Sequence, residues 1–131
     1  MIRDDRRLFW TSLTTMPTDP AAQPPKGEVR RLSLDGGDVM TVASGAFSAC
    51  AIAADKDSLY FATTLTNVVP ARSGGGATSA GGLGLMRAPI AGGEPVAVAQ
   101  ASRALAQPGA VAVDASHVYW LTETAVLRLR K

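Results

Sequence analysis

The sequence predicts an all-β chain built from consecutive antiparallel sheets of up to four strands, and three observations support this prediction. One phrase of apolar and aromatic residues occurs three times, as Leu8-Phe9-Trp10, Leu59-Tyr60-Phe61 and Val118-Tyr119-Trp120. Gly36-Gly37 and Gly92-Gly93 supply the positive φ angles that tight hairpin turns require. No segment of the 131 residues has the 3.6-residue apolar period of an amphipathic helix.

Each unit is predicted to run from a small apolar first strand through an Asp-containing turn to an aromatic second strand, and then to a third strand with Arg and a fourth strand. The predicted first strands are 51–55 and 110–114, the second strands 7–12, 58–63 and 117–122, the third strands 29–32, 85–88 and 126–129, and the fourth strands 39–43 and 95–99. The first unit therefore lacks a first strand, and the last unit lacks a fourth. Pro89 cannot donate a ladder hydrogen bond, so its strand should end or bulge there.

The spacing of the units indicates a propeller. Two insertions, at 13–26 and 66–82, lengthen the connection between the second and third strands. Without this extra length the units repeat about every 40 residues, which is the spacing of propeller blades. We therefore predict a partial β-propeller that forms a single domain over 1–131, with blades at 4–45, 48–100 and 108–131.

Two stretches carry a family resemblance. Ala112-Val113-Asp114 followed by Val118-Tyr119-Trp120, and Met86-Arg87-Ala88-Pro89 before Gly92-Gly93, resemble the repeats of bacterial six-bladed propellers of the YWTD and NHL type. Propellers of this type have six blades, whereas this sequence has predicted strands for fewer than three. The resemblance therefore implies that further sheets complete the propeller. A homodimer that completes the propeller, a longer parent protein and a gene fragment all fit. The resemblance also implies an extracytoplasmic parent, but it specifies a fold rather than a function.

The second strands are apolar on consecutive residues, which is typical of strands buried on both faces. We therefore expect Trp10, Phe61 and Trp120 to lie in the core. Cys50 is the single cysteine and lies in an apolar run, so we expect a buried, inert thiol. It has no cysteine partner for an internal disulfide and no companions for a zinc site.

Composition and charge narrow the function classes. The formal net charge of +2 is too small to indicate a nucleic-acid-binding protein. The basic clusters at residues 3–7 and 128–131 are interpreted as solvated termini. The first seven residues lack the apolar core of a secretory signal, and no apolar run approaches the ~20 residues of a membrane helix. We expect neither a cofactor nor a membrane partner.

The candidate binding residues are Arg31, Arg87 and Arg128, which occupy one position in each third strand. They could form a ring of cations on a ligand face, or each could bond an Asp or a loop carbonyl as a structural element. Asp55 and Asp114 could bind a cation or form turns. His117 is the single histidine, and no Gly-x-Ser-x-Gly nucleophile motif accompanies it.

These observations predict a non-catalytic β-propeller scaffold that acts as a binding or protein-interaction module. Its partner would be an unidentified protein or small molecule. The alternatives are a segment of a propeller lyase or hydrolase whose catalytic residues lie on other blades, and a gene fragment with no independent function. The two inserted segments are either binding loops or tolerated insertions.

Overall fold

The computed structural model describes residues 1–13, 27–45, 47–65, 82–101, 109–122 and 125–131, and these ranges contain strands and turns but no helix. The strands are β1 (Ile2–Arg3), β2 (Arg7–Leu13), β3 (Gly27–Ser33), β4 (Met40–Gly45), β5 (Phe47–Ala54), β6 (Ser58–Leu65), β7 (Gly82–Pro89), β8 (Val96–Ala101), β9 (Ala110–Val113), β10 (His117–Leu121) and β11 (Val126–Arg130). The all-β prediction is confirmed.

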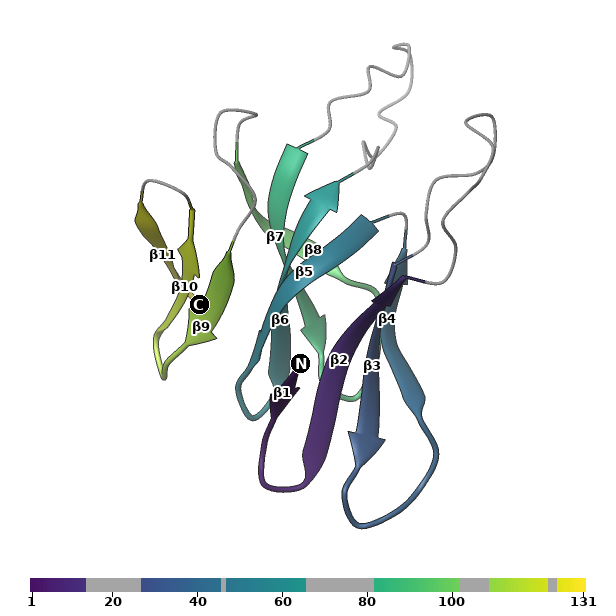
Figure 1. Ribbon diagram of the computed structural model, residues 1–131. Coiled ribbons are helices and arrows are strands. Elements are labelled where there is room, and N and C mark those ends of the chain that lie inside the picture. Colours follow the sequence, from purple (N-terminus) through teal and green to yellow (C-terminus); the bar gives the residue numbers. More distant parts are fainter. Residues whose placement is uncertain (14–26, 46, 66–81, 102–108, 123–124) are drawn as a thin grey trace, which may run out of the picture.

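The strands form three antiparallel sheets in chain order. The first sheet is β1-β2-β3-β4, the second is β5-β6-β7-β8, and the third is β9-β10-β11. Figure 1 shows the second sheet in the middle, with the first and third sheets on either side. Strand β5 contacts β1, β2 and β3 of the first sheet and β9 of the third sheet, so the first strands of the sheets lie next to one another.

The first sheet has a strand that was not predicted from the sequence. Strand β1 pairs antiparallel with β2, placing Ile2 opposite Phe9 and Arg3 opposite Leu8. The prediction that this sheet lacks a first strand is therefore wrong. The reason is the turn at Asp4, which reverses the chain and brings even a two-residue segment into hydrogen-bonding register. The predicted lack of a fourth strand in the last unit holds among the described strands, where the third sheet ends at β11.

The turns between the third and fourth strands follow the sequence prediction. Gly36, Gly37, Gly92 and Gly93 all have positive φ, at 97°, 126°, 101° and 154°. Strand β7 ends at Pro89, as expected for a residue without an N–H. A register shift follows Val29 in the first sheet and Leu85 in the second. These two residues occupy equivalent positions, so each of the two sheets has a bulge at the same place in its third strand.

Two clusters of buried side chains hold the sheets together. Between the first and second sheets lie Phe9, Val29, Ala43, Ile52, Leu59, Phe61, Met86, Ala88 and Ile90. Between the second and third sheets lie Tyr60, Leu85 and Val118, with Val98, Ala99, Val111, Val113 and Trp120 packed against them. Both faces of the middle sheet are therefore covered.

Each outer sheet has one face on which no described sheet packs, because the principal sheet-to-sheet contacts are first with second and second with third. Side chains alternate between the faces of a strand, so the register identifies the residues on each face. The outer face of the first sheet carries Leu8, Trp10, Arg30, Leu32 and Thr41. The outer face of the third sheet carries Ala112, Tyr119, Leu121, Val126 and Arg128.

This arrangement corrects the predicted burial of the aromatic strands. Residues 59–62 of β6 are buried on both faces, as predicted. In β10 only Val118 is buried, while Tyr119 and Trp120 are partly exposed and Leu121 is exposed. Phe61 lies in the core, but Trp10 and Trp120 are only partly buried. Trp10 and Tyr119 lie on the outer faces of their sheets, which no described sheet covers. Trp120 lies on the covered face of the third sheet, packed against the second cluster, and is partly exposed even there.

The predicted burial of Cys50 is also wrong, because the residue is exposed. The register between β5 and β6 shifts between Ala49 and Ala51, which leaves Cys50 as the extra residue of a bulge. Its Sγ lies 3.4 Å from the carbonyl oxygen of Ala62, and partial burial raises the pKa of the thiol.

Candidate functional site

The turns between the first and second strands share one hydrogen-bond pattern in all three sheets. The backbone N–H groups of Asp4, Asp55 and Asp114 donate to the carbonyls of Arg7, Ser58 and His117, at 2.9–3.0 Å. One carboxylate oxygen of each Asp also accepts the backbone N–H groups two and three residues later, at 2.6–3.0 Å. These aspartates therefore form the turns, in the Asx geometry that favours Asp.

The three carboxylates have lowered pKa values. Hydrogen bonds from the backbone N–H groups of Ser116 and His117, and then from the Tyr119 hydroxyl, hold the pKa of Asp114 well below its ordinary value. At Asp55 partial burial opposes ionisation, but the hydrogen bond from Lys131 and those from the turn outweigh it and lower the pKa. Asp4 behaves in the same way, with Arg6 and Arg7 as its donors. All three turns are therefore built around ionised carboxylates.

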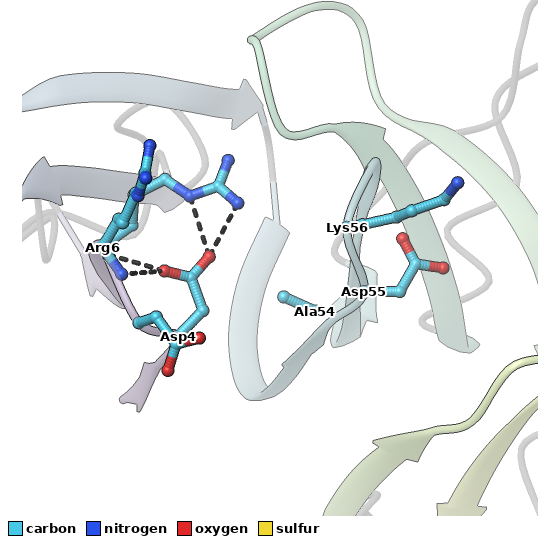
Figure 2. Close-up of a pocket in the computed structure, with 7 residues that line it drawn as sticks. Asp4, Arg6, Ala54, Asp55 and Lys56 are labelled. Atoms are coloured by element: carbon cyan, nitrogen blue, oxygen red, sulfur yellow. Dashed lines mark hydrogen bonds and ion pairs between the residues drawn. The ribbon is translucent and has the colours of Figure 1, made fainter.

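A cavity of about 450 Å³ lies between two of these turns, the one that joins the first and second strands of the first sheet and its counterpart in the second sheet. It is lined by Asp4, Asp5, Arg6, Arg7, Ala54, Asp55 and Lys56. Figure 2 shows Asp4 and Arg6 on one side of it and Ala54, Asp55 and Lys56 on the other. Arg7 is held by Asp4 through contacts of 2.7 and 2.8 Å, so this charge is already paired. Mixed charges of both signs give the cavity no selectivity for one class of ion.

A second cavity, of about 460 Å³, shares Arg6 and Arg7 with the first and is completed by Arg31, Ser33 and Asp35. Three guanidinium groups and one carboxylate make this cavity basic. Arg31 is also engaged, because it donates to the carbonyl oxygen of Ile90 at 3.0 Å and lies 2.9 Å from the sulfur of Met40. The second cavity can therefore donate hydrogen bonds to an acceptor group. Two of its three guanidinium groups, those of Arg7 and Arg31, already have partners.

The structure does not gather the three candidate arginines into a ring. Arg31, Arg87 and Arg128 each lie on their own sheet, opposite Phe9, Tyr60 and Tyr119 respectively. Arg31 reaches from the first sheet to the second, since Ile90 directly follows β7.

Arg87 donates to the hydroxyl of Ser58 at 2.9 Å and lies 6.0 Å from the centre of the Tyr60 ring. Arg128 is exposed on the outer face of the third sheet. Arg31 thus contacts the next sheet, Arg87 contacts its own sheet, and Arg128 is exposed.

Ser116, His117 and Asp114 lie close together, but not as a catalytic triad. The Ser116 hydroxyl lies 2.7 Å from Nδ1 of His117, and the nearest Asp114 oxygen lies 4.0 Å from that same nitrogen. A triad requires the hydroxyl and the carboxylate on opposite nitrogens of the ring. The Asp114 oxygen already accepts two backbone N–H groups of the turn. Ser116 and His117 therefore lie close to Asp114 because all three residues form the turn before β10.

The roles of Asp4 and Arg7 were not predicted from the sequence, where the basic residues near the N-terminus were assigned to a solvated end. The equivalence of Asp4 with Asp55 and Asp114 is the signal that could have revealed the turn and its ion pair. At the other end Lys131 is likewise engaged, because its ammonium lies 2.7 Å from Asp55 in the second sheet. The inserted segments 13–26 and 66–82 lie outside the described residues, apart from Leu13 in β2 and Gly82 in β7.

Comparisons of the chain with protein-family models, curated proteins and solved structures find no match. Within the described ranges no cluster of three or more His, Cys, Asp and Glu residues could hold a metal ion. The same ranges contain no helix that could cross a membrane.

Proposed function

We propose that this chain is a partial β-propeller that serves as a non-catalytic interaction scaffold within a larger or oligomeric propeller. One observation carries the proposal: its two outer faces are the two halves of a sheet-to-sheet contact that the chain makes twice internally. The repeat of about 40 residues and the resemblance to YWTD and NHL blades support the same assignment. The arrangement of Ser116 and His117 gives no support to an acyl-transfer site.

Exposure at equivalent positions supports the proposal on the third sheet. Val29, Leu85 and Val126 each lie two residues before the arginine of their third strand. Val29 and Leu85 are 0% and 2% exposed, because the next sheet covers them, whereas Val126 is 68% exposed. Leu121 is 45% exposed on the same face. Leu121 and Val126 are paired across the two strands, so they place apolar surface side by side on the face that a following sheet would cover.

The first sheet shows the complementary difference. Leu59 and Val118 are fully buried, because the preceding sheet covers the face on which each lies. Leu8 occupies the equivalent position in the first sheet and is only partly buried. This sheet has no preceding sheet among the described residues. Among the described sheets, none precedes the outer face of the first sheet and none follows the outer face of the third.

A tandem protein tests whether the outer faces accept further sheets. Two copies of the sequence joined by a flexible glycine-serine linker place six sheets in one chain at high effective concentration. We expect the tandem to unfold in one cooperative transition at a higher temperature than the single chain. Val126→Lys in both copies should abolish the gain, because it places a charge in each new contact.

Val96→Lys in both copies provides the matched control. Val96 is also exposed, at 57%, but it lies in β8 of the middle sheet and not on either outer sheet. We expect this variant to keep the stability gain. A tandem that melts at the temperature of the single chain would contradict the proposed function.

A further inference from the structure

We infer that the occupant of both outer faces is a second copy of this chain, docked head to tail. The outer face of the third sheet of one copy covers the outer face of the first sheet of the other copy, and the reverse contact forms at the same time. The inference rests on the proposed function, because it requires outer faces that accept sheets. It adds the identity of the partner, its orientation and the stoichiometry.

The orientation follows from the polarity of the internal contacts. The face of the first sheet that carries Phe9 packs on the face of the second sheet that carries Leu59. The face of the second sheet that carries Tyr60 packs on the face of the third sheet that carries Val118. Both contacts therefore join the central aromatic residue of one aromatic strand to the preceding aliphatic residue of the next.

The outer faces continue this series. Tyr119 is the equivalent of Phe9 and Tyr60, and it lies on the outer face of the third sheet. Leu8 is the equivalent of Leu59 and Val118, and it lies on the outer face of the first sheet. A second copy of the chain therefore supplies the face that the third sheet lacks. A contact between two third sheets would instead join two faces of the same kind.

The stoichiometry follows from the number of sheets. Head-to-tail contacts either close into a ring or continue as a filament. Propellers close with four to eight blades. The described residues of each chain form three sheets, and six is the only multiple of three in that range. Two copies therefore close the ring with two identical contacts.

A specific hydrogen bond is expected at each new contact. Arg31 crosses from the first to the second sheet and donates to the carbonyl oxygen of Ile90 at 3.0 Å. Ile90 and Leu34 occupy equivalent positions, since each follows the third strand and donates its N–H to a carbonyl in the first turn of its sheet. Arg87, the equivalent residue of the second sheet, donates instead to Ser58 of its own sheet. The third sheet has His117 at the position of Ser58, so Arg128 should follow Arg31 and donate to the carbonyl of Leu34 in the second copy. This acceptor offsets the cost of covering the Arg128 charge.

The solution mass and two single variants test the inference on the full chain. Sedimentation of the wild-type chain should give twice the chain mass of 13.5 kDa. Val126→Lys alters the outer face of the third sheet, and Thr41→Lys alters the outer face of the first sheet. Both residues are exposed in the single chain, so both variants should fold. Each variant alone should have a dissociation constant at least about tenfold higher than wild type, whereas the control Val96→Lys should match wild type.

Comparing the two variants separately distinguishes the orientations. In a head-to-tail pair every contact joins a third sheet to a first sheet, so Thr41→Lys and Val126→Lys should each weaken the dimer. In a symmetric contact between two third sheets, Thr41→Lys alone would dimerise like wild type. That result would overturn the inferred orientation.

Arg128→Ala provides a second variant that removes only the expected hydrogen bond. We expect it to weaken the dimer about tenfold while leaving the unfolding of the dissociated chain unchanged. A wild-type chain that stays at 13.5 kDa across a wide concentration range would overturn the inference. In that case a stabilised tandem would still support the scaffold, whereas an unstabilised tandem would show that both proposals fail.

Discussion

The three equivalent positions Val29, Leu85 and Val126 allow the burial pattern to be tested by one type of substitution. A buried CH₂ group contributes about 0.8 kcal/mol, and Val→Ala removes two carbon atoms. Because Val29 is 0% exposed, Val29→Ala should lower the free energy of unfolding by about 2 kcal/mol, including a cavity contribution. Leu85→Ala removes three carbon atoms and should cost about 2–5 kcal/mol. Val126 is 68% exposed, so Val126→Ala should cost only about 0.5 kcal/mol in the dissociated chain.

Urea unfolding at protein concentrations low enough to keep the chain dissociated measures these differences. The slope of the free energy against urea should stay constant across the variants, so that a change of midpoint reports stability alone. At higher concentrations the cost of Val126→Ala should rise toward that of Val29→Ala, because the second copy then covers the residue. Equal costs for the two variants at high dilution would refute the assignment of Val126 to an open face.

Three further predictions concern the turns. Asp55→Ala should lower the free energy of unfolding by about 1–2 kcal/mol, because the N–H of the buried Ser58 loses its acceptor. Asp55→Asn keeps an acceptor and should cost less than Asp55→Ala, and thermal melts compare the two. Because the folded-state pKa values of Asp55 and Asp114 are lowered, their contribution is present above the ordinary carboxyl pKa and is lost as pH falls through the folded values. Calorimetry should therefore show a falling melting temperature below about pH 4, and an unchanged melting temperature there would contradict the turn geometry. Gly92→Ala should cost about 1–2 kcal/mol in urea unfolding, since φ is 101° and no atom lies within 4 Å of the added Cβ, so the cost is backbone strain alone.

The local features of the fold could be predicted from the sequence because they depend on neighbouring residues. The Gly-Gly pairs specify positive φ whatever surrounds them, and Pro89 ends a strand because it lacks an N–H. The aromatic phrases mark strands through residue type and length. These signals located every second, third and fourth strand of the described sheets to within a few residues.

Features that depend on the neighbouring sheet could not be predicted from local sequence. The phrases around Phe61 and Trp120 are nearly identical, yet one lies in a sheet covered on both faces and the other in a sheet covered on one. Cys50 sits in an apolar run, but a bulge exposes it. Strand β1 is too short to give any periodic signal, and only the turn at Asp4 indicates it.

The candidate site shows the same dependence on position in the stack of sheets. The sequence does not distinguish Arg31, Arg87 and Arg128, because they occupy the same position in each third strand. That position predicts either a ring of cations on a ligand face or a repeated structural bond. The structure gives Arg31 a carbonyl on the next sheet, Arg87 a hydroxyl on its own sheet, and Arg128 an exposed position. Because Arg128 lies on a face that no described sheet covers, it is the arginine whose environment changes most when a sheet is added. A substitution at Arg128 therefore separates an effect on assembly from an effect on folding, which a substitution at Arg31 cannot do.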